Sequence, residues 1–256
     1  MIIKFIRTWL KLNWFVIKNR SQLSTLLSVS YICDQTDAQI QTLAQLAPLQ
    51  NIKIDADLIS FINRNYELPC PNFIKNSVLL RHGFKDGIWI ETGTYLGDTT
   101  EVLSQSAPMV YSIEPSEALV EKARMRFAGA KNVHILHGLS EAELPKLLSQ
   151  NALRNATVNF WLDGHYSAGI THQGPQETPI IEELQAIEQS LASLKQVAVF
   201  IDDIRCFTPN SPYPTLDYLV NWANQHHLLW HIEYDIFVAK STPKVKSIAG
   251  LPIKTI

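Results

Sequence analysis

The sequence predicts an α/β fold with a doubly wound, mostly parallel sheet between two layers of helices. From about residue 84 onward, short runs rich in β-branched and aromatic residues alternate with segments of helical periodicity. Strands that alternate with helices form right-handed crossovers and a parallel sheet. The composition, 46% hydrophobic and 18% charged, is that of a globular protein rather than a disordered one.

Residues 1–83 are expected to form an N-terminal helical extension, and residues 84–256 the main domain. Residues 1–20 have the pattern of a basic amphipathic helix, with Lys4, Arg7 and Lys11 at helical spacing opposite an apolar face. Two interpretations stay open: a peripheral anchor at the inner face of a membrane, or a helix that packs on its own domain or on a second copy in a homo-oligomer.

The rest of the composition argues for a cytoplasmic protein. Lys11 interrupts the first apolar stretch and no cleavage site follows, so residues 1–20 are expected to stay in the mature chain. Three widely spaced cysteines suit a reducing compartment. The balance of 22 Lys and Arg against 24 Asp and Glu predicts no nucleic-acid partner.

Each element of the main domain has its own signal in the sequence. The expected strands are residues 88–91, 109–113, 133–136, 158–162 and 197–202. The expected helices are 71–82 with Gly83 past its end, one from Asp98, one from Ser140 in a capping-box spacing with Glu143, one after Thr178–Pro179, and 215–226. The run after residue 227 predicts an antiparallel hairpin at the sheet edge, with its turn near Tyr234–Asp235.

The end of the first strand has the pattern E-x-G-x-x-x-G, formed by Glu91, Gly93 and Gly97. Glycines here let the backbone turn tightly and approach a ligand. The pattern is neither a dinucleotide fingerprint nor a P-loop. An acid directly before the turn disfavours a diphosphate and favours a ligand with an ammonium or sulfonium charge.

The next two strands end in residues suited to a nucleoside. Glu114 stands at the tip of the second strand, where a carboxylate can accept both hydroxyls of a ribose. The third strand leads into a loop with Gly138 and Ser140, which is placed to border an adenine ring.

With these motifs the chain resembles the class I S-adenosylmethionine-dependent methyltransferases over roughly residues 85–240. The resemblance implies a Rossmann-like, seven-stranded sheet with a reversed last strand. It also implies S-adenosylmethionine as the cofactor, with Thr99 and the loop amides on its methionyl carboxylate. The implied cofactor-binding residues are Glu91, Gly93, Thr94, Tyr95, Gly97, Asp98, Thr99, Glu114, Gly138, Ser140 and Asp163.

The fourth and fifth strands end in Asp163, Asp202 and Asp203. Three carboxylates at neighbouring strand tips repel one another unless they are protonated, hydrogen-bonded or bridged by a cation. Mg²⁺ prefers such oxygen ligands. The arrangement is similar to that of metal-dependent O-methyltransferases, although 39 residues separate Asp163 from Asp202, which is longer than expected. In the alternative, Asp163 serves the cofactor and the other two cap the following loop.

The polar loop 164–179 follows the fourth strand and is expected to carry specificity. His165 is a candidate general base for an acceptor hydroxyl, because its pKa suits proton transfer near neutrality. Asp163 and Asp202 complete the candidate catalytic set.

The sequence therefore predicts a methyltransferase that O-methylates a hydroxyl of a sugar, glycan or small polyhydroxylated metabolite. Two other interpretations remain: a nicotinamide-dependent oxidoreductase, and a non-catalytic, cofactor-binding scaffold protein.

Overall fold

The computed structural model describes residues 56–163 and 178–242. The chain divides into two compact units, with the boundary between Ser77 and Val78. In the first unit the structure describes α4 (Ala56–Asn63) and the start of α5 (Asn72–His82). The basic helix predicted for residues 1–20 lies outside the described residues, and the predicted domain boundary at 83/84 stays a prediction. Within the described ranges, no helix has the length and apolar character needed to cross a bilayer.

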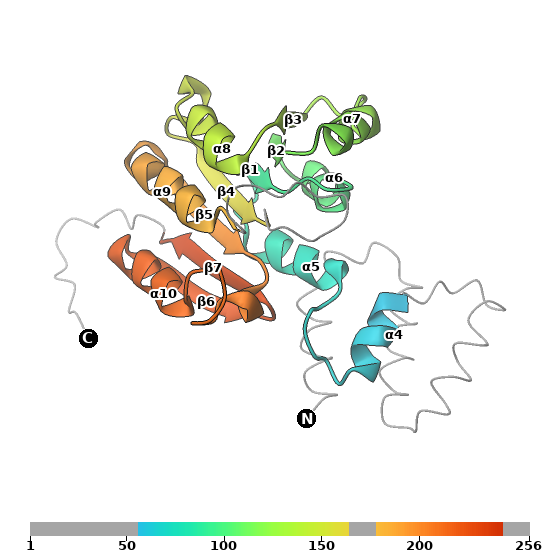
Figure 1. The fold of residues 1–256 in the computed structure, drawn as a ribbon. Coiled ribbons are helices and arrows are strands. Elements are labelled where there is room, and N and C mark those ends of the chain that lie inside the picture. The colour runs from blue at the N-terminus through green and yellow to red at the C-terminus, as the bar shows by residue number, and fades with distance from the viewer. Residues whose placement is uncertain (1–55, 164–177, 243–256) are drawn as a thin grey trace, which may run out of the picture. The chain divides into compact units, whose positions relative to one another are not determined.

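A seven-stranded sheet forms the second unit, in the order β3-β2-β1-β4-β5-β7-β6 (Figure 1). Its strands are β1 (Ile88–Thr92), β2 (Val110–Glu114), β3 (Val133–His137), β4 (Thr157–Leu162), β5 (Gln196–Ile201), β6 (Leu228–Glu233) and β7 (Ile236–Ser241). The first five strands pair in parallel, and β7 runs antiparallel to both β5 and β6. The predicted fold class and edge hairpin are both confirmed.

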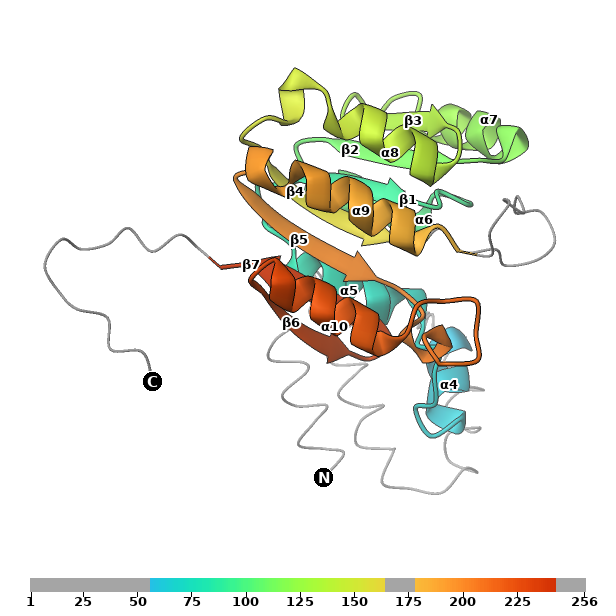
Figure 2. The ribbon, with the colours of Figure 1, turned by 60° about the vertical axis from the view of Figure 1, so that its left-hand side comes forward.

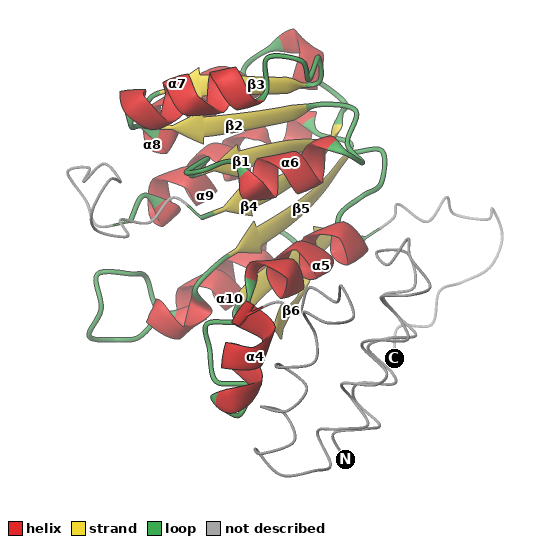
Figure 3. Cartoon of the chain, turned by 90° about the vertical axis from the view of Figure 1, so that its right-hand side faces the viewer, coloured by secondary structure: helices red, strands yellow, loops and turns green. Residues whose placement is uncertain are grey.

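Helices cover the two faces of this sheet. The α8, α9 and α10 helices lie on one face (Figure 2), while α6, α7 and the end of α5 lie on the other (Figure 3). The helices not yet given bounds are α6 (Asp98–Ser104), α7 (Glu117–Arg126), α8 (Ser140–Leu148), α9 (Ile180–Ser190) and α10 (Leu216–Gln225). In the described part of the chain, short 3₁₀ turns follow α8, α9 and β5, namely η2 (Asn151–Leu153), η3 (Leu191–Ser193) and η4 (Ile204–Cys206).

Alternation along the central strands builds a core on each face. In β5, Val199 and Ile201 belong to the core under α8, α9 and α10, whereas Ala198 and Phe200 belong to the core under α6 and the end of α5. All four are completely buried. A strand that is apolar on both sides is typical of a parallel sheet covered by helices on both faces.

The turn between β1 and α6 requires glycine at Gly97. Its φ of 86° lies in the left-handed region, and a Cβ there would come within 2.8 Å of the Phe127 ring. Gly129 makes a matched comparison, because a Cβ there meets nothing within 4 Å and its φ lies outside the left-handed region.

We therefore expect Gly97→Ala to lower the free energy of unfolding by about 2 kcal/mol, from backbone strain and displacement of Phe127. Gly129→Ala should change it by less than about 1 kcal/mol. Urea unfolding of both variants measures the difference. Equal stability of the two variants would show that the turn tolerates a side chain.

Candidate active site

The carboxyl ends of four parallel strands meet at one edge of the sheet, and backbone hydrogen bonds continue past the strands themselves. Gly93 N–H donates to Ile113 O at 2.9 Å, and Asp163 N–H donates to Thr92 O at 3.2 Å. Asp202 N–H then donates to Leu162 O at 3.1 Å. This alignment brings the predicted site residues of β1, β2, β4 and β5 to a common edge.

The glycine turn after β1 is held to the end of β2 by Glu114. Glu114 Oε2 accepts the Tyr95 N–H at 2.8 Å, while Oε1 accepts the Ser116 N–H at 2.9 Å. The Glu114 side chain is 3% exposed, whereas Tyr95 is 48% exposed at a φ of 49°. A carboxylate has about four acceptor positions, so Glu114 holds the turn and keeps capacity for two more donors.

Glu91 points into the domain. Its Oε2 accepts hydrogen bonds from Thr100 Oγ1 and Ser112 Oγ, both at 2.5 Å, and Ser112 Oγ in turn lies 2.6 Å from Thr94 Oγ1. Burial raises the pKa of Glu91 to about 7, although the two hydroxyls oppose the shift. The Glu91 carboxyl is thus only partly ionised near neutrality, which weakens the expected attraction for a cationic ligand.

The start of α6 is tied to α7 by Arg126. Its guanidinium donates to Leu96 O and pairs with the carboxylates of Asp98, at 2.7 Å, and Glu101. Asp98 is exposed and Thr99 is half-buried. Asp98 therefore contacts a side chain of its own domain, and its predicted role in cofactor binding stays a prediction.

The predicted adenine loop lies beside Glu114, since Gly138 N–H donates to Glu114 O at 3.1 Å. The predicted capping box is wrong. The residue before α8 is Leu139, no side chain caps the helix, and Ser140 is its first residue. The Ser140 hydroxyl is instead close enough to the Glu183 carboxyl to oppose the rise in the pKa of that group, although neither Glu183 oxygen makes a hydrogen bond within the described ranges. The Ser140 side chain is itself 8% exposed.

Glu183 is a site residue that the sequence analysis missed. It is 1% exposed in the first turn of α9, and burial raises its pKa to about 7 against the opposing effect of the Ser140 and Thr92 hydroxyls. A signal was present, because Glu183 falls on the apolar stripe between Ile180 and Ile187. A carboxyl on a buried stripe is seldom accidental.

The structure brings the three aspartates together. Carboxylate oxygens of Asp163, Asp202 and Asp203 lie within 4.8 Å of one another, and the last two side chains are buried. Arg205, also missed by the sequence analysis, pairs with Asp203 at 2.6 Å and with the buried Asp235 of the β6–β7 turn. The donor set is all oxygen and fits a hard divalent cation, with one Asp203 oxygen already engaged by Arg205.

A small pocket opens at these aspartates, between the end of β5 and the start of α9. Its lining includes Asp163, Asp202 and Glu183, together with Thr178 and Tyr213. The pKa of the Tyr213 hydroxyl is raised, mainly by burial, so this hydroxyl stays protonated. The candidate base His165 lies outside the described residues, as does most of loop 164–179.

Known proteins give limited comparisons, and no family model matches the chain. The Protein-L-isoaspartate O-methyltransferase of Chromobacterium violaceum is 40% identical over 70 residues, which are 27% of this chain and only 32% of that protein. The O-methyltransferase TomG of Streptomyces achromogenes, solved in complex with SAM, is 14% identical over 73% of this chain and 90% of its own, with a TM-score of 0.46. An rRNA methylase of Streptococcus thermophilus is 16% identical, over 68% of this chain and 96% of its own, with a TM-score of 0.41. What these three proteins act on is a property of those proteins and does not identify the substrate of this chain.

The buried carboxyl of Glu91 makes a testable contribution to the pH dependence of stability. Its pKa is about 7 in the folded chain against an ordinary value of 4.5. Folding favours the protonated form, so this contribution is present below pH 4.5 and is lost as the pH rises through about 7. We expect Glu91→Gln to become more stable relative to the wild type with rising pH, by up to about 3 kcal/mol above about pH 8.

Urea unfolding of both proteins from pH 4 to pH 9 checks this expectation, with Glu121→Gln on the exposed face of α7 as the control for loss of one charge. A stability difference between Glu91→Gln and wild type that stays constant with pH would show that Glu91 ionises normally.

Proposed function

We propose that the protein is an S-adenosylmethionine-dependent methyltransferase that O-methylates a sugar, glycan or small polyhydroxylated metabolite. The observation that carries the proposal is the placement of Glu114. Its buried carboxylate stands at the end of β2, is joined to the glycine turn of β1 through Tyr95 N–H, and keeps acceptor capacity for a ribose diol.

The cofactor-binding role follows from the parts around Glu114. Gly93 and Gly97 both have left-handed backbones, at φ 88° and 86°, and let the turn pass tightly from β1 into α6. Gly138 next to Glu114 begins the loop assigned to the adenine. When bound, S-adenosylmethionine supplies an electrophilic methyl group on a positively charged sulfur.

The acceptor is assigned to the edge formed by Asp163, Asp202 and Asp203. Asp163 adjoins the end of β1 through its bond to Thr92 O, which places it next to the glycine turn. Asp163 and Asp202 orient the acceptor hydroxyl and stabilise positive charge nearby, and His165 takes the hydroxyl proton. A Mg²⁺ ion held by the aspartates would lower the pKa of that hydroxyl. Alignment of the acceptor oxygen with the methyl group supplies much of the rate.

Two roles for residues 1–20 are part of this proposal: peripheral contact with a membrane, or packing on the same domain or on a second copy of the chain. The proposal also includes a cytoplasmic location and no nucleic-acid partner.

Titration of the full-length protein with S-adenosylmethionine in a calorimeter tests the cofactor assignment. We expect saturable binding that Glu114→Ala weakens by about 30-fold or more, because a charge-assisted pair of hydrogen bonds is worth about 2 kcal/mol or more. The exposed Glu121→Ala should bind as the wild type does.

The oxidoreductase alternative predicts binding of NADH instead, so the same titration with NADH separates the two. Folded wild-type protein that binds NADH and no S-adenosylmethionine would overturn the proposal. Equal affinity of Glu114→Ala and wild type would overturn the role of Glu114.

Asp202→Asn tests the division of roles at the site. We expect S-adenosylmethionine affinity within about twofold of wild type, since the acceptor side is separate from the ribose carboxylate. Mn²⁺ binding, followed by the loss of the free-ion paramagnetic resonance signal, should weaken by at least about 10-fold. Retention of Mn²⁺ binding in Asp202→Asn would refute the metal assignment. Wild-type protein that binds the cofactor but methylates no hydroxylated acceptor would favour the scaffold alternative.

A further inference from the structure

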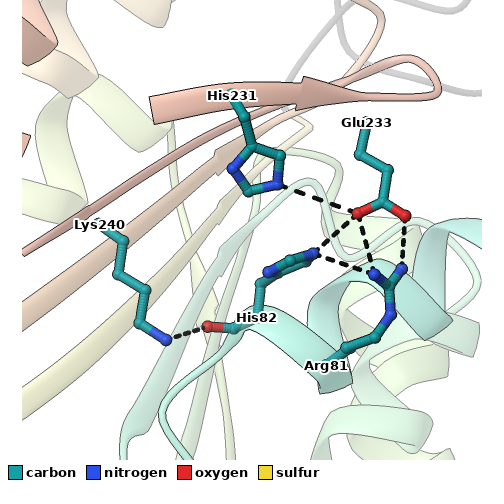
Figure 4. Close-up of polar contacts among 5 residues, drawn as sticks. All are labelled: Arg81, His82, His231, Glu233 and Lys240. Atoms are coloured by element: carbon teal, nitrogen blue, oxygen red, sulfur yellow. Dashed lines mark hydrogen bonds and ion pairs between the residues drawn. The ribbon is translucent and has the colours of Figure 1, made fainter. Parts of the chain in front are cut away.

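A second cluster of metal-ligating side chains lies at the edge strand β6, apart from the three aspartates. Within the ranges that the structure describes, His82, His231 and Glu233 are the other group whose ligand atoms all lie within 4.8 Å of one another. His82 is the last residue of α5, while His231 and Glu233 alternate along β6 and so share one side of the strand (Figure 4).

The three side chains converge on one carboxylate oxygen. Glu233 Oε2 lies 2.7 Å from His82 Nε2 and 3.9 Å from His231 Nε2. The two imidazole rings lie with their centroids 4.7 Å apart at an angle of 60°. Ligand atoms around a tetrahedral Zn²⁺ ion, at bonds of about 2.0–2.2 Å, are separated by roughly 3.3 Å. The two observed separations bracket this value, and all three ligand atoms lie within 4.8 Å of one another.

Arg81 orients the carboxylate within the cluster. Its Nη2 donates to Glu233 Oε1 at 2.6 Å, while its Nη1 lies 3.1 Å from Glu233 Oε2 and 3.2 Å from His82 Nε2. An ion on Oε2 must displace Nη1, while the Nη2 contact remains and holds the carboxylate in place. Ligating carboxylates are commonly held by such outer hydrogen bonds.

The backbone that carries His82 is itself fixed. Lys240 Nζ donates to His82 O at 2.7 Å and lies 4.1 Å from the centre of the Phe84 ring. Figure 4 shows α5, β6 and β7 meeting at this point. Residues on rigid elements hold ligand atoms more precisely than residues on loops.

The protonation states suit a cation. Burial alone would raise the pKa of Glu233, but hydrogen bonds from His82 and Arg81 lower it to about 2. Burial and the neighbouring His82 lower the pKa of His231. The carboxylate is therefore ionised, which is the form that binds metals, and an ion would take the place of the proton between His82 Nε2 and Glu233 Oε2.

We propose that His82, His231 and Glu233 form a binding site for one divalent transition-metal ion of the Zn²⁺ type, which links the end of α5 to the edge strand β6. Two imidazoles and a carboxylate suit Zn²⁺ or Co²⁺ and disfavour Mg²⁺. The fourth position is left to water. The site is structural and is independent of the methyl-transfer proposal.

The test is a calorimetric titration of untagged, chelator-treated, full-length protein with Zn²⁺, and with Co²⁺ followed by its visible absorption. We expect a binding event that His231→Ala weakens by at least about 10-fold, together with a rise in the melting temperature on addition of Zn²⁺ that this variant lacks. His231 is the least constrained of the three, being 44% exposed and 3.9 Å from its partner, so the variant should fold.

Two control variants decide where the ion binds. His134→Ala removes an exposed imidazole from β3 and should leave the binding event unchanged, as should Asp202→Asn at the other cluster. Zn²⁺ binding that His231→Ala leaves intact would overturn the proposal, as would its loss in Asp202→Asn alone. Absence of Zn²⁺ binding by folded wild-type protein would overturn it equally.

Discussion

The parallel register of β2, β1, β4 and β5 is the constraint on which the candidate site depends. Strands that run in the same direction end at the same edge, and here the backbone bonds extend one residue past each strand. Thr92 O receives the Asp163 N–H, and Leu162 O receives the Asp202 N–H. The acids that follow the strands are therefore held at neighbouring positions by main-chain geometry, before any side-chain contact acts on them.

Much of this arrangement follows from the sequence because it depends on local signals. Apolar runs of five or six residues, punctuated by caps and glycines, predict the strands and their parallel order. The hairpin at Tyr234–Asp235 follows from two adjacent strand patterns with a short polar turn. Strand ends predict where acids gather, which explains why Asp163, Asp202 and Asp203 converge as expected.

What the sequence does not predict is which way each polar side chain faces at that edge. The side chain of Glu91 points from β1 into the domain, where its hydrogen-bond partners Ser112 and Thr100 come from β2 and α6. Ser140 has the spacing of a helix cap, yet it is the first residue of α8 and lies buried near the Glu183 carboxyl of α9. Such contacts join residues far apart in the chain, so periodicity and spacing carry no information about them.

Four acids in the described part of this domain fall into two pairs, one without a guanidinium partner and one with such a partner. Glu91 accepts hydrogen bonds from two hydroxyls and Glu183 accepts none from the residues described, and burial raises the pKa of both to about 7. Asp203 and Glu233 instead pair with Arg205 and Arg81. Hydroxyls supply dipoles that only partly replace water, whereas a guanidinium supplies a full opposite charge that keeps a partly buried carboxylate ionised.

This division also decides where a cation can bind. A carboxyl that is half protonated near neutrality loses much of its attraction for a metal ion, so Glu91 and Glu183 are poor ligands despite their position. A carboxylate that arginine keeps ionised can offer one oxygen to an ion while the arginine holds the other, as Glu233 would with Oε2 once Nη1 of Arg81 is displaced. The arginine then competes with the ion for one oxygen while it orients the other. The affinity at β6 is accordingly set by the balance between displacing Nη1 of Arg81 and gaining two imidazole ligands.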